Sequence, residues 1–193
     1  MLADYDIRKQ FLMKLEKKNQ KTKDSRIIEE LSICDGEVRV DIAVANGIMH
    51  GYEIKSDLDT LDRLPKQIKC YDTTFDKNTI IVGEKFLNKI DDIVPLHWGI
   101  ELAYLNRFGN VSIKKIRSCH KNENVSSKKL LDLLWNNELK NLLKMNKIKG
   151  YSTMKREVLQ NTIIENIPFK VIRSYTRETL KFREGWRTDL PSK

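Results

Sequence analysis

Three charged residues interrupt two apolar runs in the first half of the chain. Asp41 lies among valine, isoleucine and alanine, whereas Glu53 and Lys55 flank a single isoleucine. Asn46-Gly47 separates the two runs and favours a tight hairpin, because both residues tolerate positive φ. Residues two apart in a strand share a face, so Glu53 and Lys55 should point the same way. The hairpin would bring Asp41 beside them.

Two carboxylates and an ammonium group at one place are suited to metal-assisted hydrolysis of a phosphodiester. The carboxylates would hold Mg²⁺ or Mn²⁺, and the lysine would neutralise charge that develops on the phosphoryl oxygens. The alternative is a surface set of charges on neighbouring strands, which is the better reading of this spacing alone. Charges within apolar runs cost free energy unless they are paired or metal-bound, and this favours a functional site.

The order Asp41, eleven residues, Glu53-x-Lys55 resembles the signature of the PD-(D/E)XK nuclease superfamily. Glu30, eleven residues before Asp41, resembles the additional upstream acidic residue of these nucleases. Gln67 and Tyr71 match the Gln-x-x-x-Tyr motif of the RecB-like branch. The whole stretch is similar to a small bacterial and phage family within the superfamily whose members mostly lack a defined role. One departure is a valine in place of the proline before Asp41.

The resemblance implies a metal site and a catalytic lysine. Glu30, Asp41 and Glu53, with the carbonyl of Ile54, would bind one or two Mg²⁺ or Mn²⁺ ions. Lys55 would orient the attacking water or stabilise the transition state. Glu29 is the alternative to Glu30, because adjacent strand residues point in opposite directions and only one can face the metal.

The resemblance also implies contacts with nucleic acid. Gln67 would hold a phosphate or the surroundings of Lys55, and Tyr71 would support it beside the DNA. Arg63 could contact a phosphate, or could instead form a salt bridge with Asp59 or Asp62. The expected activity is a metal-dependent nuclease, with DNA as the favoured substrate. The alternatives are an RNA-directed nuclease and a non-catalytic nucleic-acid-binding or interaction module. A homodimer is also left open, since many relatives pair to cut two strands.

Charge is divided unevenly along the 193 residues. Residues 1–102 hold 16 Lys/Arg and 19 Asp/Glu, a net charge of −3, whereas residues 103–193 hold 20 and 8, a net charge of +12. Carboxylates in one half suit a metal ion, and cations in the other suit a nucleic-acid backbone. The lack of a long apolar run or signal-peptide core, together with three cysteines that form no CxxC pair, predicts a cytoplasmic protein without a membrane partner.

The hydrophobic pattern predicts an α/β fold, a mixed β-sheet flanked by helices with a C-terminal helical appendage, and the resemblance implies that this sheet is restriction-endonuclease-like. We expect a nuclease-like core in residues 1–120 and a basic helical region packed on it in residues 121–193. The expected strands are 26–33, 37–45, 48–55, 78–83, 98–102 and 111–116, and the expected helices are 4–20, 58–71, 84–93, 126–146, 152–166 and one beginning near Pro168. Within 58–71, Pro65 marks either the first turn of a helix that starts near Leu64 or a kink.

The last of these helices carries a row of four basic residues. Lys170, Arg173, Arg177 and Lys181 fall on one side of it at helical spacing. This row is the predicted contact with the DNA backbone outside the active site, and a solvated helix face is an equally good reading of it.

Overall fold

The structure is a computed structural model that describes residues 1–19 and 25–185. Its centre is a six-stranded sheet in which the strands lie side by side in their order along the chain. The strands are β1 (Arg26–Ile33), β2 (Val38–Asn46), β3 (Ile48–Lys55), β4 (Lys77–Gly83), β5 (Gly99–Leu105) and β6 (Val111–Arg117). The β3–β4 and β4–β5 pairs are parallel and the other three pairs are antiparallel. The predicted mixed sheet is therefore confirmed.

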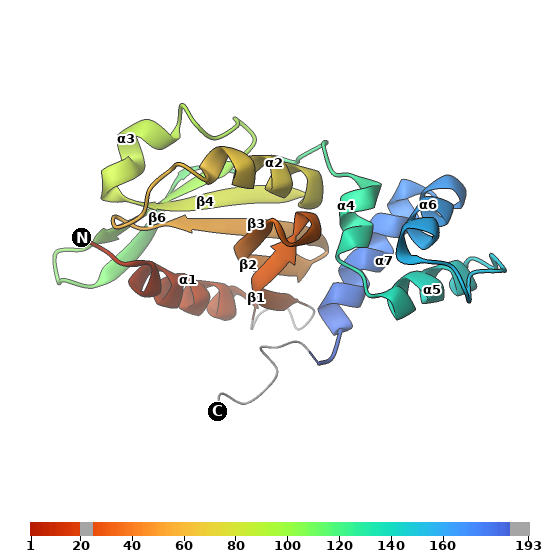
Figure 1. The fold of residues 1–193 in the computed structure, drawn as a ribbon. Coiled ribbons are helices and arrows are strands. Elements are labelled where there is room, and N and C mark those ends of the chain that lie inside the picture. Colours follow the sequence, from red (N-terminus) through yellow and green to blue (C-terminus); the bar gives the residue numbers. More distant parts are fainter. Residues whose placement is uncertain (20–24, 186–193) are drawn as a thin grey trace.

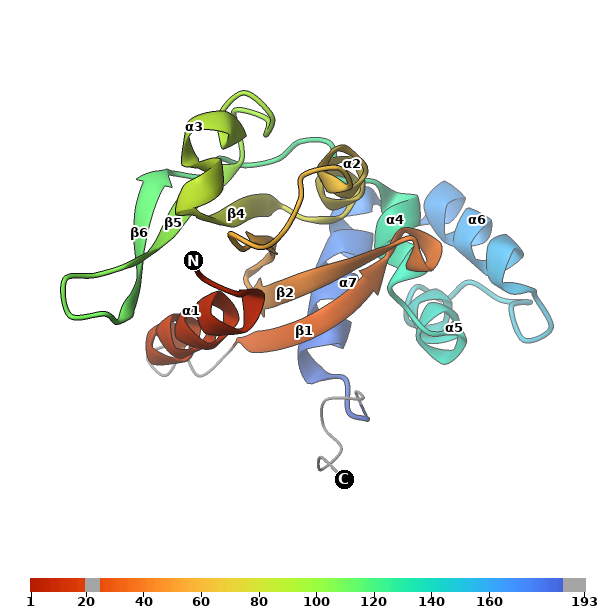
Figure 2. The ribbon, with the colours of Figure 1, turned by 60° about the vertical axis from the view of Figure 1, so that its left-hand side comes forward.

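Helices cover both faces of this sheet (Figures 1 and 2). On one face lies α1 (Asp4–Asn19), whose Ile7, Phe11 and Leu15 are buried against side chains of β2, β3 and β4. On the other face lie α2 (Leu64–Thr74) and α3 (Leu87–Ile90), and short 3₁₀ turns, η1 (Cys34–Gly36) and η2 (Glu84–Phe86), follow β1 and β4. The described helix α3 is a single turn, so the helix expected over residues 84–93 is much shorter than predicted.

Local sequence signals set most of the boundaries in the core. Gly47 adopts a positive φ of 65° at the turn between β2 and β3, as the Asn-Gly pair predicts. Pro65 lies in the first turn of α2, where its missing N–H costs nothing. The helix begins at Leu64, as one of the two readings of Pro65 predicts, and not at residue 58. Asp57 and Asp59 do not cap this helix. Asp57 binds the backbone amides of Leu2 and Lys85, and Asp59 closes the loop that follows β3.

Up to residue 185, the C-terminal region contains four helices with their own apolar core (Figure 1). They are α4 (Ser127–Asp132), α5 (Asn136–Met145), α6 (Arg156–Asn166) and α7 (Phe169–Phe182). The single helix predicted over residues 126–146 is wrong, because the chain breaks between α4 and α5. Leu133 packs into the core of the sheet, whereas its neighbour Leu134 packs into the core of the C-terminal helices, and one straight helix could not serve both.

Helix α7 is held to the sheet by polar contacts. Arg173 forms an ion pair with the buried carboxylate of Asp76, which also accepts a 2.6 Å hydrogen bond from the amide of Met49. Arg177 donates a 2.6 Å hydrogen bond to the carbonyl of Gly47 at the hairpin turn. These contacts fix the C-terminal helices against β2 and β3, and therefore against the strands that carry the candidate site.

Substitution of Gly51 tests how closely α2 must approach β3. A Cβ added at Gly51 would lie 2.6 Å from Cδ2 of Phe75 and 2.9 Å from Cδ1 of Tyr71, both fully buried. We expect Gly51→Ala to lower the free energy of unfolding by about 1–3 kcal/mol, measured by urea denaturation. The control is Ser32→Ala, at an exposed position of β1, with an expected change within about 0.5 kcal/mol. Equal stability of the two variants would contradict the close packing.

Candidate active site

The sheet opens where the predicted catalytic residues lie. Pairing between β2 and β3 ends at Ile42 and Tyr52. Beyond this point the start of β2 stays paired with β1, whereas Glu53 and Lys55 stay paired with β4. The carboxylate of Asp41 enters the gap, and its Oδ2 accepts a 2.7 Å hydrogen bond from the amide of Ile54. The two strands thus present both carboxylates at one split in the sheet.

Glu53 is the centre of a buried hydrogen-bond cluster, and its side chain is 1% exposed. Its Oε1 accepts hydrogen bonds from Nζ of Lys55 at 2.6 Å and from Nε2 of Gln67 at 2.5 Å. Its Oε2 accepts a 2.5 Å hydrogen bond from the hydroxyl of Tyr71. A buried carboxylate requires such partners, and each is a residue that the sequence placed at the site.

Helix α2 supplies two of these partners because it lies directly over β3. Gln67 and Tyr71 are four residues apart, so they fall on the same face of the helix. Burial, followed by the charge of Glu53, raises the pKa of Tyr71 well above its usual range, and the phenol therefore remains a donor. Tyr71 is fully buried, and its predicted role beside nucleic acid stays a prediction. In this structure Tyr71 positions Glu53.

Asp41 lies in a less symmetrical environment. Burial and then the negative charge of Glu53 raise its pKa from 3.8 to about 7, against the opposing effects of the Ile54 amide and of Arg8. Two carboxylates therefore share a poorly solvated space and repel one another. This arrangement favours either protonation of Asp41 or a bound cation.

Arg8 is a site residue that the sequence did not reveal. It reaches from α1 and places Nη2 2.9 Å from Oδ1 of Asp41. It also forms ion pairs with Asp4 and Glu30, both at 3.0 Å. The only signal in the sequence is the four-residue spacing of Asp4 and Arg8, which is common on solvated helix surfaces.

Glu30 lies opposite Asp41, between the paired positions Glu29–Ile42 and Leu31–Val40. Its φ of 55° is unusual for a residue with a side chain, and its carboxylate binds Arg8 and Arg39. The structure therefore selects Glu30, not Glu29, as the neighbour of Asp41, but arginines surround it. Among residues 1–19 and 25–185, no three His, Cys, Asp or Glu side chains gather as a ready-made metal cage. The metal role of Glu30 stays a prediction, as does that of the Ile54 carbonyl.

The residues predicted to contact the DNA backbone lie in different surroundings. Arg63 is exposed just before α2 and forms no ion pair within the described residues, so the salt bridge to Asp59 or Asp62 is absent there. On α7, Arg173 binds the buried Asp76, Arg177 binds the carbonyl of Gly47 at the hairpin turn, and Lys181 is buried beside Glu178. Lys170 alone among these four is classed as exposed. The DNA-binding role of the row stays a prediction, although its arginines already serve in docking.

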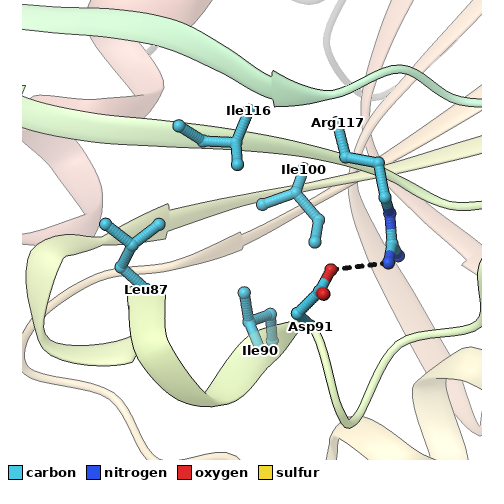
Figure 3. Close-up of a pocket in the computed structure, with 6 residues that line it drawn as sticks. All are labelled: Leu87, Ile90, Asp91, Ile100, Ile116 and Arg117. Carbon is cyan, nitrogen blue, oxygen red and sulfur yellow. Dashed lines mark hydrogen bonds and ion pairs between the residues drawn. The ribbon is translucent and has the colours of Figure 1, made fainter.

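A cavity of about 410 Å³ lies elsewhere, between α3 and the strands β5 and β6 (Figure 3). Apolar side chains line it, and an ion pair of 2.7 Å between Arg117 and Asp91 lies at its side. None of the predicted site residues lines this cavity. The cluster around Glu53 is therefore a separate feature, which lies beside the split between β2 and β3.

The fold and the site define an α/β protein with a mixed six-stranded sheet and a buried carboxylate cluster at a split between two strands. The chain belongs to the bacteriophage P4 protein cII family, whose model matches residues 1–189. It is similar to Protein cII of Enterobacteria phage P4, with 29% identity over 160 residues that cover 83% of this chain. The chain spans about 60% of the length of that relative. No solved structure shows significant similarity to this chain.

No helix within residues 1–19 and 25–185 is long and apolar enough to cross a membrane.

The raised pKa of Asp41 predicts a pH-dependent stability. The native protein binds the proton on the Asp41 carboxyl more tightly than the unfolded chain does. The resulting stabilisation is full below about pH 4 and is lost as the pH rises through about 7. Without divalent metal, the wild type should therefore lose stability relative to Asp41→Asn between pH 4 and 7, by on the order of 3 kcal/mol. Thermal unfolding of both proteins in EDTA measures this difference. Parallel pH profiles would contradict the assignment.

Proposed function

We propose that this protein is a divalent-metal-dependent nuclease of the PD-(D/E)XK type, with a restriction-endonuclease-like core and DNA as the favoured substrate. The observation that carries the proposal is the convergence of Asp41, Glu53, Lys55 and Gln67 at the split between β2 and β3. These residues come from two strands and a helix, and the chain folds so that all four meet. A purely structural role would not require two carboxylates within electrostatic reach of each other in a buried place.

The residues present fit a bound Mg²⁺ or Mn²⁺ ion. Mg²⁺ needs only one or two carboxylates from the protein, because waters and substrate phosphates complete its shell. Asp41 and Glu53 supply two, and a cation between them would relieve the repulsion that raises the pKa of Asp41. Beside them, Oε1 of Gln67 is buried without a hydrogen-bond partner. Such an orphaned oxygen suits a metal-bound water.

The side chains have separable tasks in phosphodiester hydrolysis. A bound ion would polarise the phosphate and lower the pKa of the attacking water. Lys55 places a cation where negative charge develops on the phosphoryl oxygens, and its contact with Glu53 fixes its position. Gln67 and Tyr71 hold the carboxylate of Glu53 in one orientation. This arrangement keeps the reacting groups in place before the substrate arrives.

A second candidate function is a non-catalytic nucleic-acid-binding or interaction module on the same fold. The observation that favours it is that both oxygens of Glu53 already accept hydrogen bonds from internal donors. The cluster could then serve only to hold α2 on β3. An RNA-directed nuclease remains the third candidate, because the site does not distinguish DNA from RNA.

Cleavage assays on plasmid, linear and single-stranded DNA and on RNA separate these candidates. We expect cutting at low salt with Mg²⁺ or Mn²⁺, no cutting with EDTA, and a loss of about a hundredfold or more in Asp41→Asn and Glu53→Gln. Lys55→Ala should lower turnover more than affinity, because its charge acts chiefly in the transition state.

The matched control is Glu84→Gln, which removes an exposed carboxylate at the end of β4. Full activity in an Asp41→Asn, Glu53→Gln double variant would contradict the mechanism. Salt-sensitive binding without cleavage, equal in all variants, would support the binding module.

The C-terminal helices offer a basic surface other than α7. The loop between α5 and α6, at the right-hand end of the molecule in Figure 1, carries exposed lysines and no acidic residue between residues 144 and 155. The exposed lysines here are Lys144 in the last turn of α5 and Lys147, Lys149 and Lys155 in the loop, and none forms an ion pair within the described chain. Free cations on a projecting loop suit the nucleic-acid backbone better than the arginines of α7, which already have partners.

Substitution of this lysine surface should weaken DNA binding and its dependence on salt. For Lys144→Ala, Lys149→Ala and Lys155→Ala combined, we expect the slope of log K against log salt to fall in magnitude by roughly 2–3. Fluorescence anisotropy over a salt series measures it.

A control of equal charge is Lys89→Ala, Lys114→Ala and Lys115→Ala combined, on α3 and β6. If the slope of log K against log salt falls more in the control than in the loop variant, the contact with the DNA backbone lies near α3 and β6 and not on the loop.

A further inference from the structure

One guanidinium joins the carboxylates at the mouth of the site. Arg8 places Nη1 3.0 Å from Oε1 of Glu30 and Nη2 2.9 Å from Oδ1 of Asp41. Nη1 also donates a 3.1 Å hydrogen bond to the carbonyl of Asp41, and Nε lies 3.0 Å from Oδ1 of Asp4. Nη2 also donates a 3.5 Å hydrogen bond to Oδ2 of Asp4, so all three nitrogens of the group are used and three carboxylates share it.

The contact is electrostatically strong because it is shielded from water. The side chains of Arg8 and Asp41 are 17% and 19% exposed. Opposite charges attract more strongly at such a place than at a fully solvated surface. Arg8 thus supplies the positive charge that Glu30 and Asp41 would otherwise obtain from a metal ion.

The backbone at Glu30 shows that this arrangement is imposed by its surroundings. A positive φ of 55° is strained for a residue with a side chain, and it persists only where neighbouring contacts fix it. Both oxygens of Glu30 are held, one by Arg8 and the other by Arg39 at 2.6 Å. Arg39 is largely exposed, so Arg8 provides the better-shielded of the two contacts.

Helix α1 is anchored independently of this ion-pair cluster. The amide of Leu2 donates a 2.8 Å hydrogen bond to Asp57, and the amide of Asp57 donates a 3.1 Å hydrogen bond to the carbonyl of Leu2. Ile7 and Phe11 are buried against the sheet. The side chain of Arg8 can therefore leave the carboxylates while the helix stays in place.

We propose that Arg8 is a displaceable counter-cation, which competes with the divalent ion for Asp41 and Glu30 and so sets the metal affinity of the site. The inference rests on the proposed function, because it assumes that Asp41 binds metal together with Glu53, and it includes the predicted metal ligand Glu30. When the ion enters, the guanidinium gives up Asp41 and Glu30 and keeps Asp4. The freed guanidinium is a planar fork of donors, which suits phosphate oxygens.

The test is Mn²⁺ binding to the full chain, measured by electron paramagnetic resonance of the free ion. Arg8→Gln removes the competitor, so we expect its Mn²⁺ affinity to exceed that of the wild type by about tenfold or more. Arg8→Lys keeps the positive charge without the planar guanidinium, so its Mn²⁺ affinity should lie between those of the wild type and Arg8→Gln. Lys9→Gln removes a neighbouring exposed charge of α1 and should change affinity by less than about twofold.

A second measurement follows Arg8 directly. In the nuclear magnetic resonance spectrum of the wild type, saturation with Mg²⁺ should shift the Arg8 Nε–H signal and leave the Lys9 amide signal in place. Circular dichroism confirms that Arg8→Gln is folded before its affinity is compared.

The outcomes separate the two proposals. Equal or weaker Mn²⁺ binding by Arg8→Gln, or an unmoved Arg8 signal in metal-saturated wild type, would overturn the competition and leave the nuclease proposal standing. No Mn²⁺ binding by the wild type and by Arg8→Gln would overturn both. Tighter binding by Lys9→Gln as well as Arg8→Gln would show a general field effect and would also overturn the specific role of Arg8.

Discussion

The buried negative charge of Glu53 is the constraint on which the surrounding structure depends. A carboxylate that is almost fully removed from water must be compensated, and here Lys55, Gln67 and Tyr71 provide the compensation. Two of these partners lie on α2, so the requirement fixes the height and rotation of that helix over β3. The absence of a side chain at Gly51 permits the close approach.

Asp41 is the second buried carboxylate that needs compensation, and its partner lies on the other side of the sheet. Its carboxylate lies in the split between β2 and β3 and accepts a hydrogen bond from the amide of Ile54. Arg8 of α1 forms an ion pair with the same carboxylate from the opposite face. Both helical layers therefore converge on one pair of acids. The C-terminal helices act at a greater distance, through the contacts of α7 with Asp76 and Gly47, which steady the hairpin that joins the two strands.

The sequence predicted the parts of this arrangement that depend on local chemistry. The Asn-Gly turn, the proline in the first turn of α2 and the alternating residues of β2 and β3 give the hairpin and place Glu53, Lys55 and Gln67 together. It could not predict Arg8, because the ion pair of Arg8 with Asp41 joins residues far apart in the chain. The positive φ of Glu30 and the break at Leu133 were also missed. Both depend on tertiary contacts: two arginines at Glu30, and two separate cores competing for neighbouring leucines.

The central claim is that Asp41 and Glu53 hold a divalent ion beside Lys55. Anomalous diffraction from crystals soaked in Mn²⁺ tests it most directly. The account predicts a single strong anomalous peak between the two carboxylates, within coordination distance of both, and no such peak in Asp41→Asn crystals. A peak elsewhere, or none at saturating Mn²⁺ with Lys55 still bound to Glu53, would contradict it.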